Sequence, residues 1–313
     1  MRISNSEIQV FKRCKRRWYF NYYLQLKPNI DSATGAAPIG TRIHKVLDQY
    51  YNAKLNGASD DMARALAMRY HGTLVAYDVE VGRASLDDKK YTSEIELTTL
   101  MLEGYFDWLQ ETGADEGLRV VASETPVEVD IEVDGTPVTV MGLLDLRLYR
   151  ELDGAHLFID DKTCMEMTSF SKWSHLNEQF KTYDWLLSHA TGEHTDGGMF
   201  NLLRKVKRTS RATPPFHGRI EVRHSDKEME SFDQTLHGEI RDIIRLRRAL
   251  DAGSAGDLMG RIYPTPTRDC SWECPYFQVC PMVDRADGSA GRMIELTMHP
   301  ADPYERYDIS REE

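Results

Sequence analysis

Residues 158–164 read FIDDKTC, an apolar run that ends in two aspartates, a lysine and a threonine. The run belongs to a longer stretch in which apolar and polar residues alternate, a pattern typical of β-strands. Asp-Gly pairs at 134–135 and 153–154 divide this stretch into three segments. Asp-Gly between alternating segments favours tight hairpin turns. We therefore predict a three-stranded antiparallel meander over residues 124–163.

The turn at 153–154 determines which side chains meet across the last two strands. A two-residue turn places Asp145 opposite Lys162, whereas a four-residue loop places Asp145 opposite Asp160. In both registers these three residues share one face of the sheet, and Asp161 points to the other face. Opposed Cβ atoms lie about 4.5–5.5 Å apart. Two carboxylates and an ammonium group are therefore expected to converge.

Converging carboxylates need an explanation, because they repel unless one is protonated or a cation lies between them. A hard divalent ion held by oxygen ligands would provide that cation. The same count from the turn at 134–135 places Glu124 opposite Asp145, so Glu124 is a candidate for supporting the ligands from behind. The alternative is an ordinary strand end at the surface, with aspartate and lysine paired as a salt bridge.

Three of the five cysteines lie in CSWECPYFQVC, at Cys270, Cys274 and Cys280. Cys14 lies far upstream in a predicted helix, and Cys164 is the fifth. Four thiolates suit a zinc ion or an iron–sulfur cluster. Because zinc ribbons normally combine two close cysteine pairs, we favour iron–sulfur over zinc; scattered buried thiols are the third alternative. A cluster would clasp the N-terminal helix to the C-terminal segment.

Composition describes a soluble globular protein of 313 residues with 41% hydrophobic residues and a net charge of −11. The sequence contains no run of about 18 apolar residues and begins without an apolar signal segment, so we expect a cytoplasmic protein with no membrane partner. The acidic total weighs against nucleic acid, but Lys and Arg concentrate at 12–18 and 204–211. Each basic run is alternatively a solvated face.

The remaining segments follow the helical period or alternate. We predict helices at about 4–23, 39–54, 59–82, 93–112, 169–190 and 227–251, and strands at 198–206 and 217–224.

An ordered series of motifs extends from about residue 3 to residue 282. It comprises SxxxxFKRCKRRWYFNY, Gly40-x3-His44, Gly142-x2-Asp145, Asp160-x-Lys162-Thr163, Gln179-x3-Tyr183 and the terminal cysteines. In this order the motifs resemble those of the RecB/AddB-type branch of the PD-(D/E)xK nuclease superfamily. The resemblance is to its iron–sulfur members, which include the CRISPR adaptation nucleases and phage-encoded relatives.

The resemblance implies roles for the matching residues. Asp145 and Asp160 correspond to metal-binding carboxylates, with the backbone carbonyl of Asp161 and the ring of His44 as further ligands. Lys162 corresponds to the catalytic lysine, which orients the attacking water and offsets charge on the phosphate. By itself, His44 would more often be a core histidine.

The resemblance also implies a DNA contact and a cluster. Gln179 and Tyr183, one helical turn apart, correspond to the motif that contacts the DNA strand near the scissile bond; on their own they would more often pack within the helix. The implied cluster ligands are Cys14, Cys270, Cys274 and Cys280.

The chain departs from the family pattern at two places. The spacing between Cys270 and Cys274 is x3 instead of x2, so the cluster loop is one residue longer. Cys164 stands where glycine commonly follows the lysine–threonine pair, and we interpret it as a non-ligand.

The implied fold is α/β (α+β), a restriction-endonuclease-like core with a mixed sheet flanked by helices. We divide the chain into a mostly helical N-terminal part at 1–115, which carries Cys14 and His44, a nuclease core at 116–252, a cysteine-cluster segment at 253–283 that forms a C-terminal clasp, and a poorly ordered tail at 284–313. No role is assigned to residues 55–115.

The resulting hypothesis is a Mg²⁺- or Mn²⁺-dependent deoxyribonuclease with a structural [4Fe-4S] cluster, acting as an exonuclease or on single-strand ends. The basic runs, with Trp18, Trp173 or Tyr183, would hold a single strand by charge and base stacking. The expected setting is DNA recombination, repair or CRISPR/phage-type processing in a bacterial cell or phage-infected host. Because no GxxxxGK[ST] motif is present, unwinding would require a helicase or recombination partner. Alternatives are a DNA-binding assembly factor with little catalysis and a zinc-stabilised interaction protein.

Overall fold

The computed structural model describes residues 1–29, 32–192, 195–253 and 258–308. The chain forms two compact units, each built from separated segments. Unit 1 comprises Met1–Asp31, Glu128–Gly142 and Asp226–Glu313, and unit 2 comprises Ser32–Val127 and Leu143–Ser225. The division of the chain into four consecutive ranges stays a prediction. The two units group residues by their packing in space, whereas the four ranges group them by position along the sequence. Among the described residues, no helix is both long and apolar enough to cross a bilayer.

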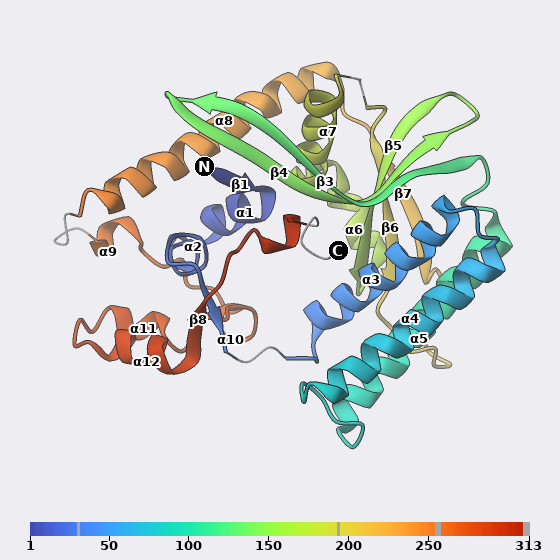
Figure 1. Cartoon of the computed structure of the whole chain (residues 1–313), viewed down its shortest axis with the longest axis horizontal. Helices are drawn as coiled ribbons and strands as arrows, with labels where there is room; N and C mark the ends of the chain where they lie inside the picture. Colours follow the sequence, from blue (N-terminus) through green and yellow to red (C-terminus); the bar gives the residue numbers. More distant parts are fainter. Residues whose placement is uncertain (30–31, 193–194, 254–257, 309–313) are drawn as a thin grey trace. The chain divides into compact units, whose positions relative to one another are not determined.

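Three long helices begin unit 2: α3 (Ala36–Leu55), α4 (Asp60–Glu80) and α5 (Lys89–Thr112). They pack side by side (Figure 1). The side chain of Ser59 caps α4 by accepting a hydrogen bond from the Met62 amide, and Asp88 caps α5 in the same way. Gly113, with φ of 62°, ends α5 in the left-handed conformation that glycine favours. All three predicted helices in this part are confirmed.

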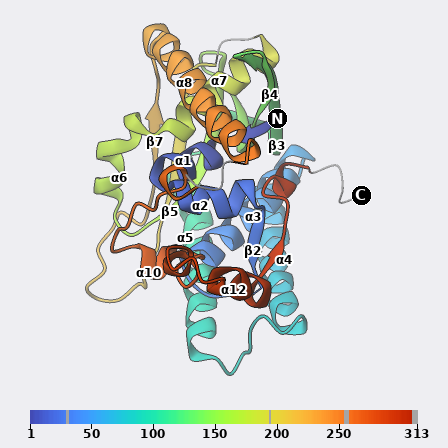
Figure 2. The same cartoon turned by 90° about the vertical axis from the view of Figure 1, so that its left-hand side faces the viewer.

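Unit 1 combines segments from both ends of the chain. Helices α1 (Asn5–Arg13) and α2 (Lys15–Trp18) are followed by a π-helical turn at Tyr19–Tyr23 and strand β2 (Leu26–Pro28). Helix α8 (Asp226–Asp251) packs against α1 (Figure 2). The later short elements are α9 (Leu258–Arg261), α10 (Cys270–Glu273), α11 (Cys280–Val283), α12 (Ser289–Thr297), strand β8 (Met298–Pro300) and a 3₁₀ turn at Glu305–Tyr307.

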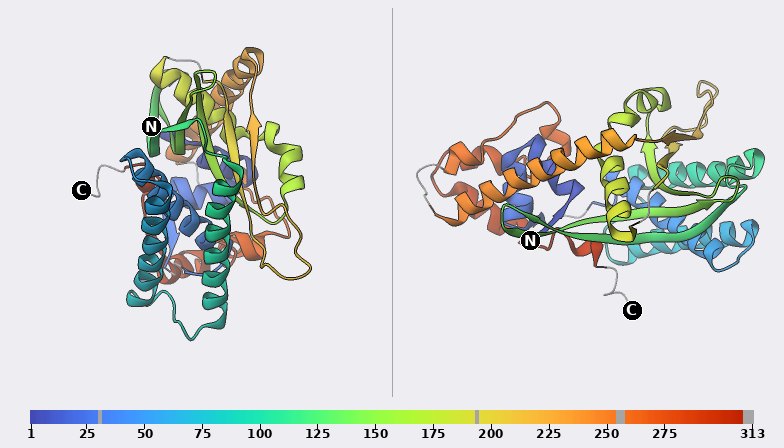
Figure 3. Two further views of the ribbon diagram at one scale, coloured as in Figure 1. Left: turned by 90° about the vertical axis from the view of Figure 1, so that its right-hand side faces the viewer. Right: turned by 90° about the horizontal axis from the view of Figure 1, so that it is seen from above.

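The predicted meander consists of β3 (Leu118–Val133), β4 (Thr136–Arg150) and β5 (Ala155–Cys164). Figure 3 shows β3 and β4 running side by side as a long hairpin. Strands β6 (Gly198–Arg204) and β7 (His217–Val222) extend the sheet: β4–β5 and β6–β7 pair antiparallel, and β5–β6 pair parallel. The sheet is therefore mixed, as predicted. Strand β1 (Arg2–Ser4) adds a parallel pair with the unit 1 part of β4, which the sequence did not suggest.

The β4–β5 register selects one of the two predicted alternatives. Arg150 pairs with Ala155 and Leu146 with Ile159, so the loop has four residues. The Asp153 carboxylate closes this wider loop by accepting hydrogen bonds from the Arg150 guanidinium and the Ala155 amide. The pairing ends at Leu146 and Ile159, and beyond it the Asp161 amide donates a hydrogen bond to the Asp145 carboxylate.

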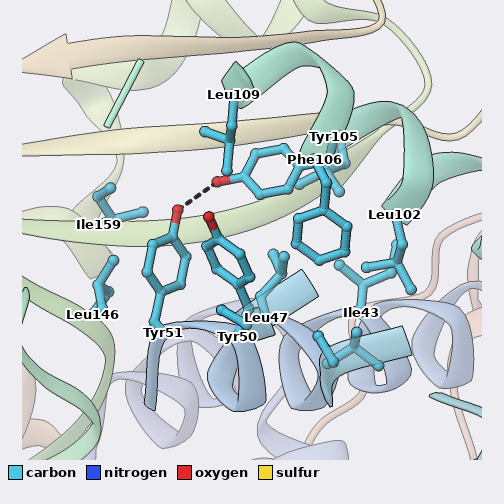
Figure 4. Close-up of a cluster of buried hydrophobic side chains, with 14 of the residues drawn as sticks. Ile43, Leu47, Tyr50, Tyr51, Leu102, Tyr105, Phe106, Leu109, Leu146 and Ile159 are labelled. Carbon is cyan, nitrogen blue, oxygen red and sulfur yellow. Dashed lines mark hydrogen bonds between the residues drawn. The ribbon is translucent and has the colours of Figure 1, made fainter. Parts of the chain in front are cut away.

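Helices cover both faces of the sheet in unit 2. Leu146 and Ile159 pack with Ile43 and Leu47 of α3 and with α5 in one hydrophobic core (Figure 4). Within this core the hydroxyl groups of Tyr51 and Tyr105 are hydrogen-bonded at 2.7 Å. On the opposite face, Phe158 and Phe200 contact the aromatic side chains of α6 (Met167–Trp173) and α7 (Glu178–Thr191).

Two predicted helices are interrupted. The helix expected at 4–23 breaks at Cys14, whose backbone is extended with φ −162° and ψ 112°. The break allows Arg16 and Trp18 to be buried, so tertiary packing overrides local propensity. The helix expected at 169–190 divides into α6, a 3₁₀ turn at Ser174–Leu176 and α7, because Asn177 caps α7 by accepting a hydrogen bond from the Phe180 amide.

The C-terminal segment was expected to be poorly ordered, yet its described part forms α12 and β8. Strand β8 pairs antiparallel with β2, and Met298 joins a small core with Phe20, Tyr276 and Val279. This pairing links segments near opposite ends of the sequence, so local sequence patterns could not reveal it.

Glu7 is the buried centre of unit 1. Its side chain is fully buried, and one oxygen accepts hydrogen bonds from Trp18 Nε1 and Arg247 Nη2, both at 2.9 Å. The other oxygen accepts a hydrogen bond from the Tyr304 hydroxyl. Burial raises the pKa of Glu7, whereas Arg247 and the hydrogen bonds oppose that shift. The carboxylate thus joins α1, α2, α8 and the C-terminal segment.

We expect Glu7→Ala to lower the free energy of unfolding by about 3 kcal/mol, because Trp18, Tyr304 and the partly buried Arg247 would lose a fully buried carboxylate partner. Denaturant unfolding followed by circular dichroism measures this change. The control Glu230→Ala removes an exposed carboxylate that pairs with Lys227, and should change stability by less than about 0.5 kcal/mol. Equal stability of the two variants would contradict the role given to Glu7.

Candidate active site

Three potential metal ligands converge where α3 meets the middle of strands β3 and β4. One ligand atom each from His44, Glu124 and Asp145 lies within 4.8 Å of the others. His44 comes from α3, Glu124 from β3 and Asp145 from β4. His44 Nδ1 lies 3.2 Å from Asp145 Oδ1. One imidazole nitrogen and two carboxylates form a donor set that suits Mn²⁺ and also accepts Mg²⁺.

Asp145 is held in place from two sides. Its Oδ1 faces His44, and its Oδ2 accepts a hydrogen bond from the Asp161 amide at 2.7 Å. Burial by itself would raise the pKa of Asp145, but His44, Lys162 and the Asp161 amide outweigh burial and lower it. Asp145 is therefore ionised and suited to bind a cation.

His44 responds to the same carboxylate. Burial lowers its pKa, but the neighbouring Asp145 raises it more, to about 9. The site thus attracts positive charge to this position, and a metal ion would take the place of the proton, since a ligating imidazole must be neutral. The residues present therefore fit a divalent cation.

Glu124 was predicted to support the ligands. In the structure its carboxylate lies among them, within 4.8 Å of the ligand atoms of His44 and Asp145. Burial, Asp145 and Asp48 raise its pKa to about 7. Its backbone has φ of +43°, within the long strand β3. Non-glycine residues seldom adopt this left-handed conformation, and such strain tends to occur at functional sites. No sequence signal marks a positive φ at a glutamate inside an alternating strand.

Asp48 is a site residue that the sequence analysis missed. It lies one helical turn beyond His44 on α3, and its Oδ1 accepts a hydrogen bond from Ser123 Oγ at 2.6 Å. The same hydroxyl lies 3.3 Å from the Asp145 carbonyl oxygen. Asp48 and Ser123 therefore link α3 to β4 next to the ligand group by hydrogen bonds. The His44-x3-Asp48 spacing, which places both residues on one helix face, was the available signal.

Asp160 and Lys162 form an ion pair beside this group. Lys162 Nζ lies 2.5 Å from Asp160 Oδ2, and Asp160 is only 1% exposed. Burial lowers the pKa of Lys162, but Asp160 and Asp145 raise it more, so the amine is charged. Burial raises the pKa of Asp160, and Asp145 adds to this. Asp160 Oδ2 thus faces the Lys162 ammonium group.

The Asp161 side chain points away from this group, as predicted. Its Oδ1 accepts a hydrogen bond from Asn201 Nδ2 at 2.6 Å, and Asn201 also lies 3.0 Å from the Tyr105 hydroxyl. Burial and Asp145 raise the pKa of Asp161. Tyr51 and Tyr105 continue the network to Arg219, which pairs with Asp115. This buried network anchors β5 from the face opposite Lys162.

The two predicted DNA-contacting residues meet each other. Gln179 Nε2 donates a hydrogen bond to the Tyr183 hydroxyl at 2.7 Å. Tyr183 is 4% exposed and packs edge-on against Phe158, and Trp18 is fully buried. The suggestion that bases stack on Tyr183 or Trp18 is therefore wrong, because core packing covers both rings. Trp173 is 45% exposed.

The four predicted cluster cysteines all lie in unit 1, and none forms a disulfide. Burial raises the pKa of Cys274, and Cys270 and Cys14 raise it further. Cys280 is affected in the same way by burial, Cys14 and Cys274. Cys274 therefore interacts electrostatically with the other three thiols. Within the described part of the chain, no three of their sulfurs lie within 4.8 Å of one another.

Comparison with known proteins gives low similarity to individual structures. The chain is 18% identical to SSO0001, with a TM-score of 0.35, over 66% of this chain and 79% of that one. It is 11% identical to a structure named "Putative exonuclease" from Eubacterium rectale, with a TM-score of 0.47, over 87% of this chain and 92% of that one. Neither score is high enough to support an argument about function. No curated protein matches the chain.

The sequence model of a protein family gives a broader match. It is described as the PD-(D/E)XK nuclease superfamily, and it matches residues 2–281. This range contains the mixed sheet, the ligand group and the ion pair of Asp160 with Lys162. The chain belongs to the PD-(D/E)XK nuclease superfamily.

Proposed function

We propose that the protein is a metal-dependent deoxyribonuclease that hydrolyses phosphodiester bonds at DNA ends. The observation that carries this proposal is the convergence of His44, Glu124 and Asp145 next to the Asp160–Lys162 pair, in a chain that belongs to a nuclease superfamily. DNA as substrate follows from the superfamily, and the run of Lys and Arg at 204–211 supplies charge that complements phosphates.

Each side chain of the site has a separate role in the proposed reaction. Asp145, Asp160, His44 and Glu124 would hold one or two divalent cations, with the Asp161 carbonyl as a further ligand. When bound there, such cations would supply Lewis-acid chemistry for hydrolysis of the phosphodiester. Lys162 keeps its positive charge beside Asp160, where it orients water and offsets negative charge on the phosphate. Gln179, held by Tyr183, would contact the strand near the scissile bond.

We further propose that Cys14, Cys270, Cys274 and Cys280 bind a [4Fe-4S] cluster, which would place the chain in the RecB/AddB-type branch. Zn–S bonds of about 2.3 Å would bring four thiolates within about 4 Å of one another. In the described residues no three of these sulfurs lie within 4.8 Å of one another, and a cluster of several metal atoms would hold its thiolates farther apart than one zinc ion does. Recombination, repair or CRISPR/phage-type processing with a helicase partner stays a prediction.

Asp160→Asn and Lys162→Ala should each lower Mn²⁺- or Mg²⁺-dependent cleavage of DNA at least about a hundredfold, because each removes charge that acts on the transition state. Single- and double-stranded DNA labelled at the 5′ or 3′ end would measure rate and polarity together. Asp61→Asn and Lys89→Ala make the same changes on exposed parts of α4 and α5 and should leave the rate unaltered. Full activity in Asp160→Asn would assign cleavage to another site or a contaminant.

His44→Ala should weaken Mn²⁺ binding about tenfold or more, because it removes a nitrogen ligand that Asp145 orients. Isothermal titration calorimetry of the full chain with Mn²⁺ measures this without depending on activity. His237→Ala changes a histidine on α8 whose Nδ1 lies 2.9 Å from the Asp233 carbonyl oxygen, and it should bind Mn²⁺ like the unaltered protein. If both variants bind equally, His44 is not a ligand.

Anaerobically purified protein should be brown and contain iron and sulfide, and Cys280→Ser should lose colour, iron and thermal stability together, because a bound cluster stabilises the folded state. Cys164→Ser is the control, since Cys164 belongs to unit 2, and it should keep the cluster. A colourless protein that contains only zinc would rule out the iron–sulfur proposal in favour of a zinc site.

A further inference from the structure

A pocket of about 420 Å³ lies over β6 and β7 in unit 2. Its floor includes Leu202 and Ile220 from the two strands, Met167 and Ser171 of α6 form one wall, and Thr213 lies in the loop that forms the opposite wall. The volume is within the range typical of small-ligand sites. None of the site residues described above lines this pocket.

Strand register places the pocket next to the lysine of the site. Lys162 on β5 pairs with Leu202 on β6, and Leu202 pairs with Gly218 on β7. Paired residues point to the same face, and adjacent strands lie about 4.8 Å apart. The pocket floor therefore begins one strand away from Lys162, on the face that also carries Asp160.

Gly218 makes room for this floor. A Cβ atom at Gly218 would lie 2.8 Å from the terminal carbon of Met167, so a larger residue would push Met167 into the pocket. Arg204 holds the far wall in place, because its guanidinium donates hydrogen bonds to the carbonyl oxygens of Met165 and Thr213. The hydrogen bonds of Arg204 thus connect the end of β5 to the loop that carries Thr213.

The lining suits a flat group with a polar edge. Met167, Leu202, Ile220 and two prolines supply apolar surface, and Thr168, Ser171 and Thr213 supply hydroxyl groups. Glu166 is the acidic residue of the lining, and its carboxylate accepts hydrogen bonds from Thr168 and Ser169. A phosphate would be repelled by Glu166. A nucleobase offers apolar faces, and its amino groups can donate hydrogen bonds to a carboxylate.

The surrounding charge favours a nucleic-acid chain. The segment 204–211 carries five Lys or Arg residues and no acidic residue, and Lys172 lies on α6. This concentration of positive charge contrasts with the net charge of −11 for the whole chain. A strand whose backbone follows the basic segment could insert a base into the adjoining pocket.

We propose that this pocket binds the base of a nucleotide that flanks the scissile phosphate of single-stranded or frayed DNA. The inference rests on the proposed nuclease function and specifies its substrate. A base inside a duplex would first have to leave the stack, which costs free energy, whereas a base in a single strand is already available. The pocket therefore makes the enzyme prefer single-stranded ends.

Substitutions to phenylalanine on each wall of the pocket test this proposal. Ser171→Phe on α6 and Thr213→Phe on the opposite loop should each weaken binding of a fluorescent single-stranded oligonucleotide about five- to tenfold, measured by anisotropy in an Asp160→Asn background that keeps the DNA intact. Ser231→Phe makes the same change at an exposed residue of α8 that does not line the pocket, and should bind like its parent. Thermal melting confirms that each variant is folded.

A modified substrate provides a second readout. Replacing single nucleotides near the cut by an abasic spacer should raise KM about five- to tenfold at one position for the unaltered enzyme, with little change in kcat. Ser171→Phe should abolish that sensitivity, because its pocket is already filled.

The outcomes separate the two proposals. If Ser171→Phe weakens oligonucleotide binding but the unaltered protein cleaves no DNA, the nuclease function is contradicted and the pocket proposal is retained. Metal-dependent cleavage with unchanged binding and KM in folded Ser171→Phe and Thr213→Phe would overturn the pocket and retain the nuclease. Loss of self-association in these variants by analytical ultracentrifugation, with DNA binding unchanged, would assign the pocket to a second copy of the chain and also overturn the inference.

Discussion

The hydrogen bond from the Asp161 amide to the Asp145 carboxylate, 2.7 Å long, fixes the position of the candidate site. It joins β4 to β5 at the point where both strands deliver acidic residues, and it turns the remaining oxygen of Asp145 toward His44. Because side chains alternate along β5, holding residue 161 in this way presents Asp160 and Lys162 together on the opposite face. One backbone contact thus sets the geometry of four side chains.

Burying several charged groups together costs free energy of folding. Contacts on both faces of the sheet offset this cost. On one face Lys162 neutralises Asp160, and His44 neutralises Asp145. On the other face Asp161 is satisfied by Asn201, which continues through paired tyrosines to a buried arginine (Figure 4 shows the tyrosine pair). The pKa of Glu124 is raised to about 7 because burial, Asp145 and Asp48 together outweigh the opposing charge of His44. A divalent cation is the element that would balance the remaining negative charge.

The sequence predicted those features that depend on local patterns. Asp-Gly turns and alternation located the meander, and the side-chain alternation alone placed Asp160 and Lys162 on one face and Asp161 on the other. It could not decide the length of the 151–154 loop, because that depends on hydrogen bonds made by Asp153. Nor could it locate the positive φ of Glu124, the break at Cys14 or the β2–β8 pairing, since these depend on partners distant in sequence. Asp48 was visible as a helical neighbour of His44 but carried no motif.

Unit 1 shows that protein contacts already join the segments that carry the cysteines. Arg16, almost fully buried, pairs with Asp284 and donates hydrogen bonds to the carbonyl oxygens of Ile262 and Cys280. Phe20 stacks on Tyr276, whose hydroxyl donates a hydrogen bond to the Leu26 carbonyl oxygen. A metal cluster bound here would reinforce an existing interface and would not have to create it. These contacts do not depend on the thiols, so they would reduce the conformational entropy that cluster binding has to overcome.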